Sequence, residues 1–166
     1  MLKKIVLVAL LSVVGLYADI VAQAKQIVKS IDTNTLQQML EKNPNIPLID
    51  VRIKSDILKQ GGYIQANKNV NISRDKLEFL ISNEVNPQDQ FVVYCYDGNI
   101  SLLATKQLLE MGYKNVLHYK DSYNGWSKAN LPSRSLDKYP ESFLYSKVQE
   151  VASGVYTSIG ITQPYL

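Results

Sequence analysis

The sequence has few side chains that act as nucleophiles or metal ligands. Cys95 is its only cysteine and His118 its only histidine in 166 residues. A single cysteine cannot form a disulfide within the chain, so the hydrophobic core has to stabilise the fold. Zinc-binding patterns need several cysteines or histidines, and we therefore expect neither a metal nor another cofactor. Any thiol chemistry has to come from Cys95.

Long runs of one charge are also missing. The 18 basic and 15 acidic residues give a formal net charge of +3, and the basic residues are scattered along the chain. Nucleic acids and acidic membrane surfaces are usually bound by clusters of Lys and Arg. The pattern therefore argues against a nucleic-acid partner.

No apolar stretch reaches the roughly 20 residues that a helix needs to cross a membrane. One apolar stretch, residues 5–16, follows Lys3 and Lys4 and is closed by a polar segment. A basic start, a short apolar core and a small residue before a polar one are typical of a secretory signal. We expect cleavage after Ala18, although Leu16 occupies a position that prefers a small residue; an uncleaved anchor is the alternative. The protein is therefore expected to be exported, to the periplasm.

Short apolar segments alternate with segments of helical periodicity along the chain. Strand patterns occur at 47–52, 70–72, 91–95 and 116–119. Helix patterns occur at 20–31, where the helix runs into an extended lead-in, and at 33–42, 75–82 and 101–111, and begin again at 124. Strands that alternate with helices at this spacing predict an α/β fold, with a parallel sheet flanked by helices on both faces.

The last part of the chain has a different pattern. Residues 133–139 are expected to be a linker. Apolar residues then recur at helical spacing: Leu144, Val148, Val151, Val155 and Ile159. We expect an additional amphipathic C-terminal helix that packs on its own domain or on a protein partner. The predicted divisions are a signal peptide at 1–18, a domain with its lead-in at 19–132, and the linker and helix at 133–166.

Cys95 ends the strongest strand pattern, and turn-forming residues separate it from a helix expected to be capped by Ser101. In parallel α/β sheets, ligands bind at the carboxyl ends of the strands. Backbone N–H groups of the loop and the N-terminus of the helix favour negative charge there, and the thiolate is the nucleophilic form of cysteine. The alternative is that Cys95 is the last core residue of its strand, since free cysteines are often simply buried.

Several motifs together resemble a single rhodanese domain over about residues 30–132. They are Leu48-Ile49-Asp50-Val51-Arg52, then Gly62-Tyr63-Ile64, then Val92-Val93-Tyr94-Cys95 with Gly98 and Ser101, and finally Trp126 and Leu131-Pro132. None of these motifs is specific alone, but their order and spacing are.

The resemblance implies a sulfurtransferase site that works by covalent catalysis. In such enzymes a loop cysteine attacks a sulfane sulfur, for instance of thiosulfate, becomes a persulfide and passes the outer sulfur to an acceptor. It implies that Cys95 is the nucleophile and persulfide carrier, that Asp50 and Arg52 support the site, and that the partners are a small sulfur donor and a thiol or protein persulfide. The implied substrate-binding loop comprises Tyr96, Asp97, Gly98, Asn99, Ile100 and Ser101.

The sequence departs from the family pattern at the loop itself. The family's Cys-x-x-Gly-x-Arg has Ile100 in the place of its arginine, and Asp97 adds a negative charge beside the cysteine. Tyr63 replaces a histidine, and Asp121-Ser122 replaces a glycine pair. We expect such a site to handle the thiosulfate dianion poorly and to prefer a neutral polysulfide or a protein persulfide.

Two other functions are compatible with the same residues. A catalytically weak or inactive rhodanese-like module would keep the fold and bind a protein partner, and Ile100 and Asp97 favour this alternative. A phosphatase is the third reading, because related folds hold phosphate in a cysteine loop that ends in arginine. Phosphoryl oxygens are bound by bidentate hydrogen bonds from arginine, so Ile100 in that place argues against a phosphatase.

Overall fold

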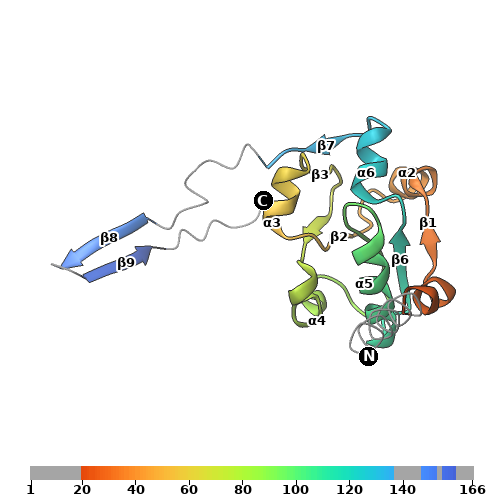
Figure 1. Ribbon diagram of the computed structural model, residues 1–166, viewed down its shortest axis with the longest axis horizontal. Helices are drawn as coiled ribbons and strands as arrows, with labels where there is room; N and C mark the ends of the chain where they lie inside the picture. The colour runs from red at the N-terminus through yellow and green to blue at the C-terminus, as the bar shows by residue number, and fades with distance from the viewer. Residues whose placement is uncertain (1–19, 137–146, 153–154, 160–166) are drawn as a thin grey trace, which may run out of the picture.

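The computed structural model describes residues 20–136, 147–152 and 155–159, and the expected signal peptide lies outside them. The domain is built on a five-stranded parallel sheet with the strand order β1-β6-β5-β2-β4 (Figure 1). The strands are β1 (Ser30–Ile31), β2 (Leu48–Asp50), β4 (Asn69–Asn71), β5 (Gln90–Tyr94) and β6 (Asn115–Tyr119). The expected parallel sheet is confirmed, and the extended lead-in supplies β1.

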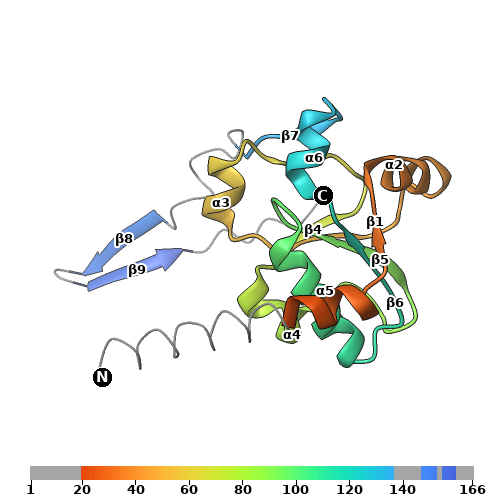
Figure 2. The same cartoon turned by 45° about the vertical axis from the view of Figure 1, so that its right-hand side comes forward.

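Helices cover both faces of the sheet, as expected. They are α2 (Thr33–Lys42), α3 (Lys54–Lys59), α4 (Leu77–Leu80) between the 3₁₀ turns η1 (Arg74–Lys76) and η2 (Ile81–Asn83), α5 (Asn99–Glu110), α6 (Ser122–Lys128), and a further helix at 20–27. Buried residues of α4 and α5 share one core cluster, whereas those of α2 and α6 share another. The 20–27 helix lies beside α5, with Ala24 packed against Leu102 (Figure 2). None of the helices in the described residues is long and apolar enough to span a membrane.

Strand β5 is buried on both faces because it lies between β2 and β6 in the middle of the sheet. Phe91, Val93 and Cys95 belong to the core cluster that includes α5, whereas Val92 and Tyr94 belong to the cluster that includes α6. Successive side chains of any extended strand point to opposite faces. This alternation directs the Cys95 side chain to the α5 side of the sheet.

Two expectations for the end of the chain are wrong. Part of the expected linker forms β7 (Ser133–Arg134), which pairs antiparallel with β3 (Tyr63–Ile64). In place of the C-terminal helix there is a hairpin of β8 (Lys147–Ala152) and β9 (Val155–Ile159) (Figure 1).

The physical reason lies in the residue types of this segment. Val, Thr and Ile favour strands, and a Ser-Gly pair, which favours a turn, stands between the two strands. Over so short a stretch, apolar spacing does not separate a helix from two strands. The partner surface expected on a C-terminal helix is therefore not formed as predicted, and Leu144 lies outside the described residues.

Candidate active site

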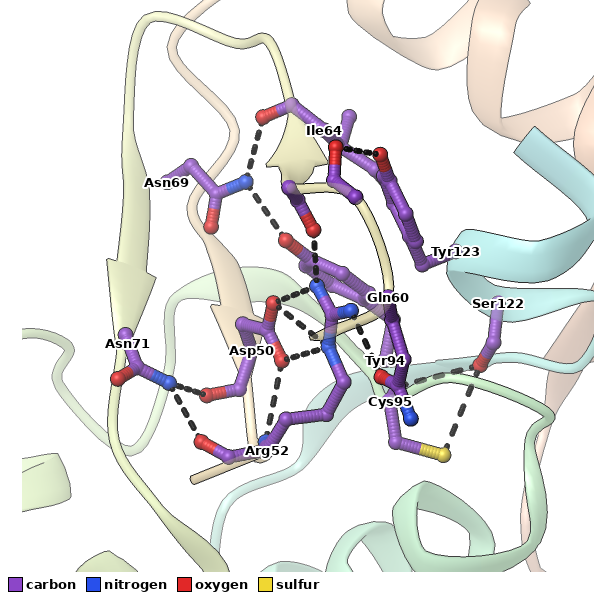
Figure 3. Close-up of polar contacts among 12 residues, drawn as sticks. Asp50, Arg52, Gln60, Ile64, Asn69, Asn71, Tyr94, Cys95, Ser122 and Tyr123 are labelled. Carbon is purple, nitrogen blue, oxygen red and sulfur yellow. Dashed lines mark hydrogen bonds and ion pairs between the residues drawn. The ribbon is translucent and has the colours of Figure 1, made fainter. Parts of the chain in front are cut away.

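Cys95 directly follows β5, at the carboxyl edge of the parallel sheet. Because β2 and β6 flank β5, the segments after these two strands are its neighbours at this edge. They bring Asp50, Arg52 and Ser122 to the surroundings of Cys95 (Figure 3). The cysteine is only 1% exposed, so a reactant has to enter the loop to reach its sulfur.

Two hydrogen-bond donors point at the Cys95 sulfur from the loop that follows it. The backbone N–H of Gly98 donates to Sγ at 3.2 Å, and the hydroxyl of Ser101 donates at 3.3 Å. The prediction that Ser101 caps the helix is therefore wrong. Ser101 lies inside the first turn of α5, and its hydroxyl donates to the sulfur instead. Hydrogen bonds to an ionised acceptor are stronger than neutral ones, so this pair favours negative charge on Sγ.

Ser122 fixes the end of the strand on the other side of the sulfur. Its hydroxyl accepts a hydrogen bond from the Cys95 backbone N–H at 3.2 Å and donates to the Tyr119 carbonyl at 2.9 Å, while Sγ lies 3.9 Å away (Figure 3). Ser122 has a positive φ of 52°, a conformation that favours glycine. A glycine would adopt this backbone conformation without strain, whereas Ser122 adopts it at a cost.

Asp97 brings the expected negative charge close to the sulfur. Its Oδ1 lies 3.7 Å from Sγ, near enough to accept the proton of the thiol. Asn99 holds the carboxylate in place, with its backbone N–H on Oδ1 at 3.1 Å and its side-chain amide on Oδ2 at 2.8 Å. The sulfur thus lies between the Asp97 carboxylate on one side and the Gly98 and Ser101 donors on the other.

The loop turns an apolar rim to solvent. Tyr96 is 38% exposed, and Ile100, in the first turn of α5, is 51% exposed. No lysine or arginine occurs between Cys95 and Ser101. Of the six predicted loop residues, Asp97, Gly98 and Ser101 contact the sulfur, and the six include no cation that could bind an anionic donor.

Gly98 is required by both its backbone conformation and its surroundings. It occupies the N-cap position of α5 with φ +90°, in the left-handed region. A Cβ on this residue would lie 2.2 Å from the Lys120 carbonyl oxygen, which belongs to the segment after β6. Any other side chain would therefore push the loop, and the N–H that contacts Sγ, away from β6.

Asp50 and Arg52 form a buried ion pair that anchors the segment after β2 (Figure 3). Arg52 donates from Nε to both carboxylate oxygens of Asp50 at 2.9 and 3.1 Å, and from a terminal nitrogen to Oδ2 at 2.5 Å. It also donates to Gln60 Oε1 at 3.1 Å and to the Gly62 carbonyl at 2.9 Å, and it stacks 4.6 Å from the centre of the Tyr123 ring. Burial raises the pKa of the Asp50 carboxyl, and Arg52 opposes that rise. Among the described residues this pair makes no hydrogen bond to Sγ, and we expect it to support the site structurally.

Several residues of the site gave little signal in the sequence. Ser122 and Asp121 stood out only as departures from a glycine pair; Asp121 accepts hydrogen bonds from the backbone and side chain of Thr33 at the start of α2. His118 is buried, and its ring bonds to the Gly98 carbonyl. Among the described residues, no group of three His, Cys, Asp or Glu could hold a metal ion.

The comparisons with known proteins agree with this fold and identify the family. The family model for the rhodanese-like domain matches residues 32–129, and the chain belongs to that family. Thiosulfate sulfurtransferase 18 of Arabidopsis thaliana is 30% identical over 131 residues, which cover 72% of this chain and 93% of that protein. The rhodanese domain-containing protein CG4456 of Drosophila melanogaster is 33% identical over 98 residues, covering 52% of this chain and 86% of its own length.

A solved structure gives the same fold. The polysulfide-sulfur transferase of Wolinella succinogenes, a homodimer, superposes with a TM-score of 0.63 at 27% identity, covering 75% of this chain and 91% of that one. The protein is therefore a rhodanese-like member of the sulfurtransferase family.

Replacing Arg52 by methionine should leave the Asp50 carboxylate buried without its cation. Removing one partner of a buried ion pair typically costs about 3–5 kcal/mol, and urea unfolding should show a loss of that size. Arg74→Met is the matched control, because its pair with Glu78 is partly exposed and such pairs contribute about 1 kcal/mol or less. Similar losses in the two variants would contradict the structural role of Arg52.

Gly98→Ala should destabilise the protein more than Gly112→Ala. Both glycines have positive φ, +90° and +98°, but a Cβ on Gly112 would meet nothing within 4 Å. We expect Gly112→Ala to cost about 1–2 kcal/mol, the penalty of the left-handed backbone alone, and Gly98→Ala to add the displacement of the loop from Lys120. Thermal unfolding of the two variants measures the difference, and equal losses would show that the contact with Lys120 carries no weight.

Proposed function

We propose that this protein is an exported sulfurtransferase or persulfide carrier in which Cys95 takes a sulfane sulfur from a donor and passes it to a thiol. The observation that carries the proposal is the pair of donors on the sulfur, the Gly98 N–H at 3.2 Å and the Ser101 hydroxyl at 3.3 Å. They stabilise negative charge on Sγ both before sulfur is taken up and after it is released. Membership of the rhodanese-like family supports the same chemistry.

The reaction proceeds in two displacements at sulfur. Cys95 first gives up its thiol proton to solvent, and the Gly98 N–H and the Ser101 hydroxyl stabilise the thiolate. The Cys95 thiolate then attacks the terminal sulfane sulfur of the donor; a new S–S bond forms, the S–S bond of the donor breaks, and the leaving group keeps the electron pair. An acceptor thiolate attacks the outer sulfur of the persulfide in turn, and Cys95 leaves as the thiolate.

The composition of the loop favours a polysulfide or a protein persulfide over thiosulfate as the donor. Thiosulfate carries two negative charges on a compact ion, while the loop offers the Asp97 carboxylate and an exposed Ile100 where the family has arginine. The neutral polysulfide expected from the sequence is a narrow chain without charge, so it needs a fixed cation less and reaches a sulfur that is 1% exposed more easily. The Wolinella succinogenes relative is itself a polysulfide-sulfur transferase.

A non-catalytic binding module is the second candidate. The burial of Cys95 and the apolar rim of Tyr96 and Ile100 favour it, because an exposed apolar rim over an inaccessible thiol suits binding more than chemistry. The two functions differ in whether Cys95 forms a persulfide.

Incubation of the purified protein with polysulfide should add about one sulfur atom to Cys95. Intact-protein mass spectrometry measures the gain, which should disappear on adding a thiol and should be absent from Cys95→Ser. If the folded protein keeps a free thiol and gains nothing from polysulfide or thiosulfate, the enzyme proposal is wrong and the binding module stands.

Ile100→Arg should give the loop activity with thiosulfate. The new guanidinium supplies the missing cation, and we expect persulfide formation from thiosulfate to rise by at least tenfold, which corresponds to about 1.4 kcal/mol, while formation from polysulfide changes little. The matched control is Ile53→Arg, which adds the same charge at an exposed position outside the loop. A rise of the same size in the control would assign the effect to net charge rather than to position 100.

Export is proposed from the N-terminal sequence. When the full chain is expressed in a Gram-negative host, the periplasmic fraction should contain a protein whose mass corresponds to a start at residue 19. Full-length protein retained in the cytoplasm would contradict export, and full-length protein in the membrane fraction would indicate the uncleaved anchor.

A further inference from the structure

The only histidine of the chain is buried directly behind the loop of Cys95. His118 lies on β6, and its Nε2 is 3.0 Å from the carbonyl oxygen of Gly98. Its other ring nitrogen, Nδ1, is 2.9 Å from the hydroxyl of Ser30 on β1. Both polar atoms of this side chain are therefore satisfied, one of them by the residue whose N–H contacts the sulfur.

The partners of His118 determine its tautomer. A carbonyl oxygen can only accept a hydrogen bond, so Nε2 carries the proton and donates to Gly98. In the neutral ring Nδ1 then accepts the proton of the Ser30 hydroxyl. Burial lowers the pKa of His118, which keeps the ring in this neutral form.

Gly98 links this histidine to the sulfur. Its carbonyl receives two donors, His118 Nε2 at 3.0 Å and the Leu102 N–H of α5 at 3.1 Å. Its α-carbon faces the Lys120 carbonyl so closely that no side chain fits between them. Strand β6 thus holds Gly98 through the His118 side chain, and the backbone just after β6 confines it on the other side, so that the Gly98 N–H is aimed at Sγ.

We infer that His118 is a positioning residue for sulfur transfer: through Gly98 it keeps the loop N–H on the sulfur of Cys95. The inference rests on the proposed function for its effect on turnover. Its effect on the reactivity of the thiol stands without that function, because the donor acts on negative sulfur whatever the electrophile.

Three variants test this role. His118→Leu removes the donor, whereas His118→Gln carries an amide N–H that can donate to the same carbonyl. Val116→Ala is the control for damage to the strand, because Val116 is buried at the start of β6. For each variant, kcat and KM for polysulfide and the rate of alkylation of Cys95 by iodoacetamide are measured on folded protein.

We expect His118→Leu to lower kcat and the alkylation rate by about tenfold, the effect of one hydrogen bond to a charged group, with KM unchanged. His118→Gln should recover most of the loss, and Val116→Ala should leave kcat and alkylation near the values of the unchanged protein despite lower stability. Equal losses in the leucine and glutamine variants, or in the Val116→Ala control, would overturn the inference. Absence of turnover in the unchanged protein would defeat the proposed function, and the alkylation rates would still decide the role of His118.

Discussion

The close approach of Gly98 to β6 is the constraint on which the loop of Cys95 depends. Three parts of one residue are used at once: the N–H reaches the sulfur, the carbonyl accepts His118 and α5, and the α-carbon lies against the Lys120 carbonyl. A left-handed backbone without a side chain is the geometry that permits all three. The sulfur is therefore held by the sheet, not by a loop that could move freely away from it.

Electrostatics around the sulfur are balanced in an unusual way for a thiol nucleophile. Neutral donors, the Gly98 N–H and the Ser101 hydroxyl, favour negative charge, and Asp97 opposes it from 3.7 Å. Arg52, the buried cation of the site, is paired with Asp50 and does not offset the charge of Asp97. Stability and reactivity therefore rest on different interactions. The buried Asp50–Arg52 ion pair stabilises the fold, and the hydrogen bonds from Gly98 and Ser101 stabilise negative charge on the reacting sulfur.

The position of Cys95 was predictable because residues 91–94 of its strand form a continuous apolar run that ends in turn residues. A strand buried on both faces reads as a continuous apolar run, and its carboxyl end is where a parallel sheet binds ligands. Asp50 and Arg52 were placed near the site only through the family resemblance. Their partners, Gln60 and Gly62, come from a turn that sequence patterns do not connect to them.

Other features could not be predicted, for physical reasons. The bond between His118 and Gly98 joins residues 20 positions apart, and nothing local to either marks it. Ser122 has a positive φ, and its residue type gives no sign of this conformation. Apolar spacing alone predicts a helix in the C-terminal segment, but the strand preference of Val and Ile prevails there, and the segment forms a hairpin.

The central claim is that sulfur passes through Cys95 on its way to an acceptor. A single-turnover experiment with isotopically labelled polysulfide and an acceptor thiol tests it most directly. The account predicts that the label appears first on Cys95 and then leaves it at the rate at which it enters the acceptor, with no transfer in Cys95→Ser. Label that reaches the acceptor as fast in Cys95→Ser as in the unchanged protein would contradict it.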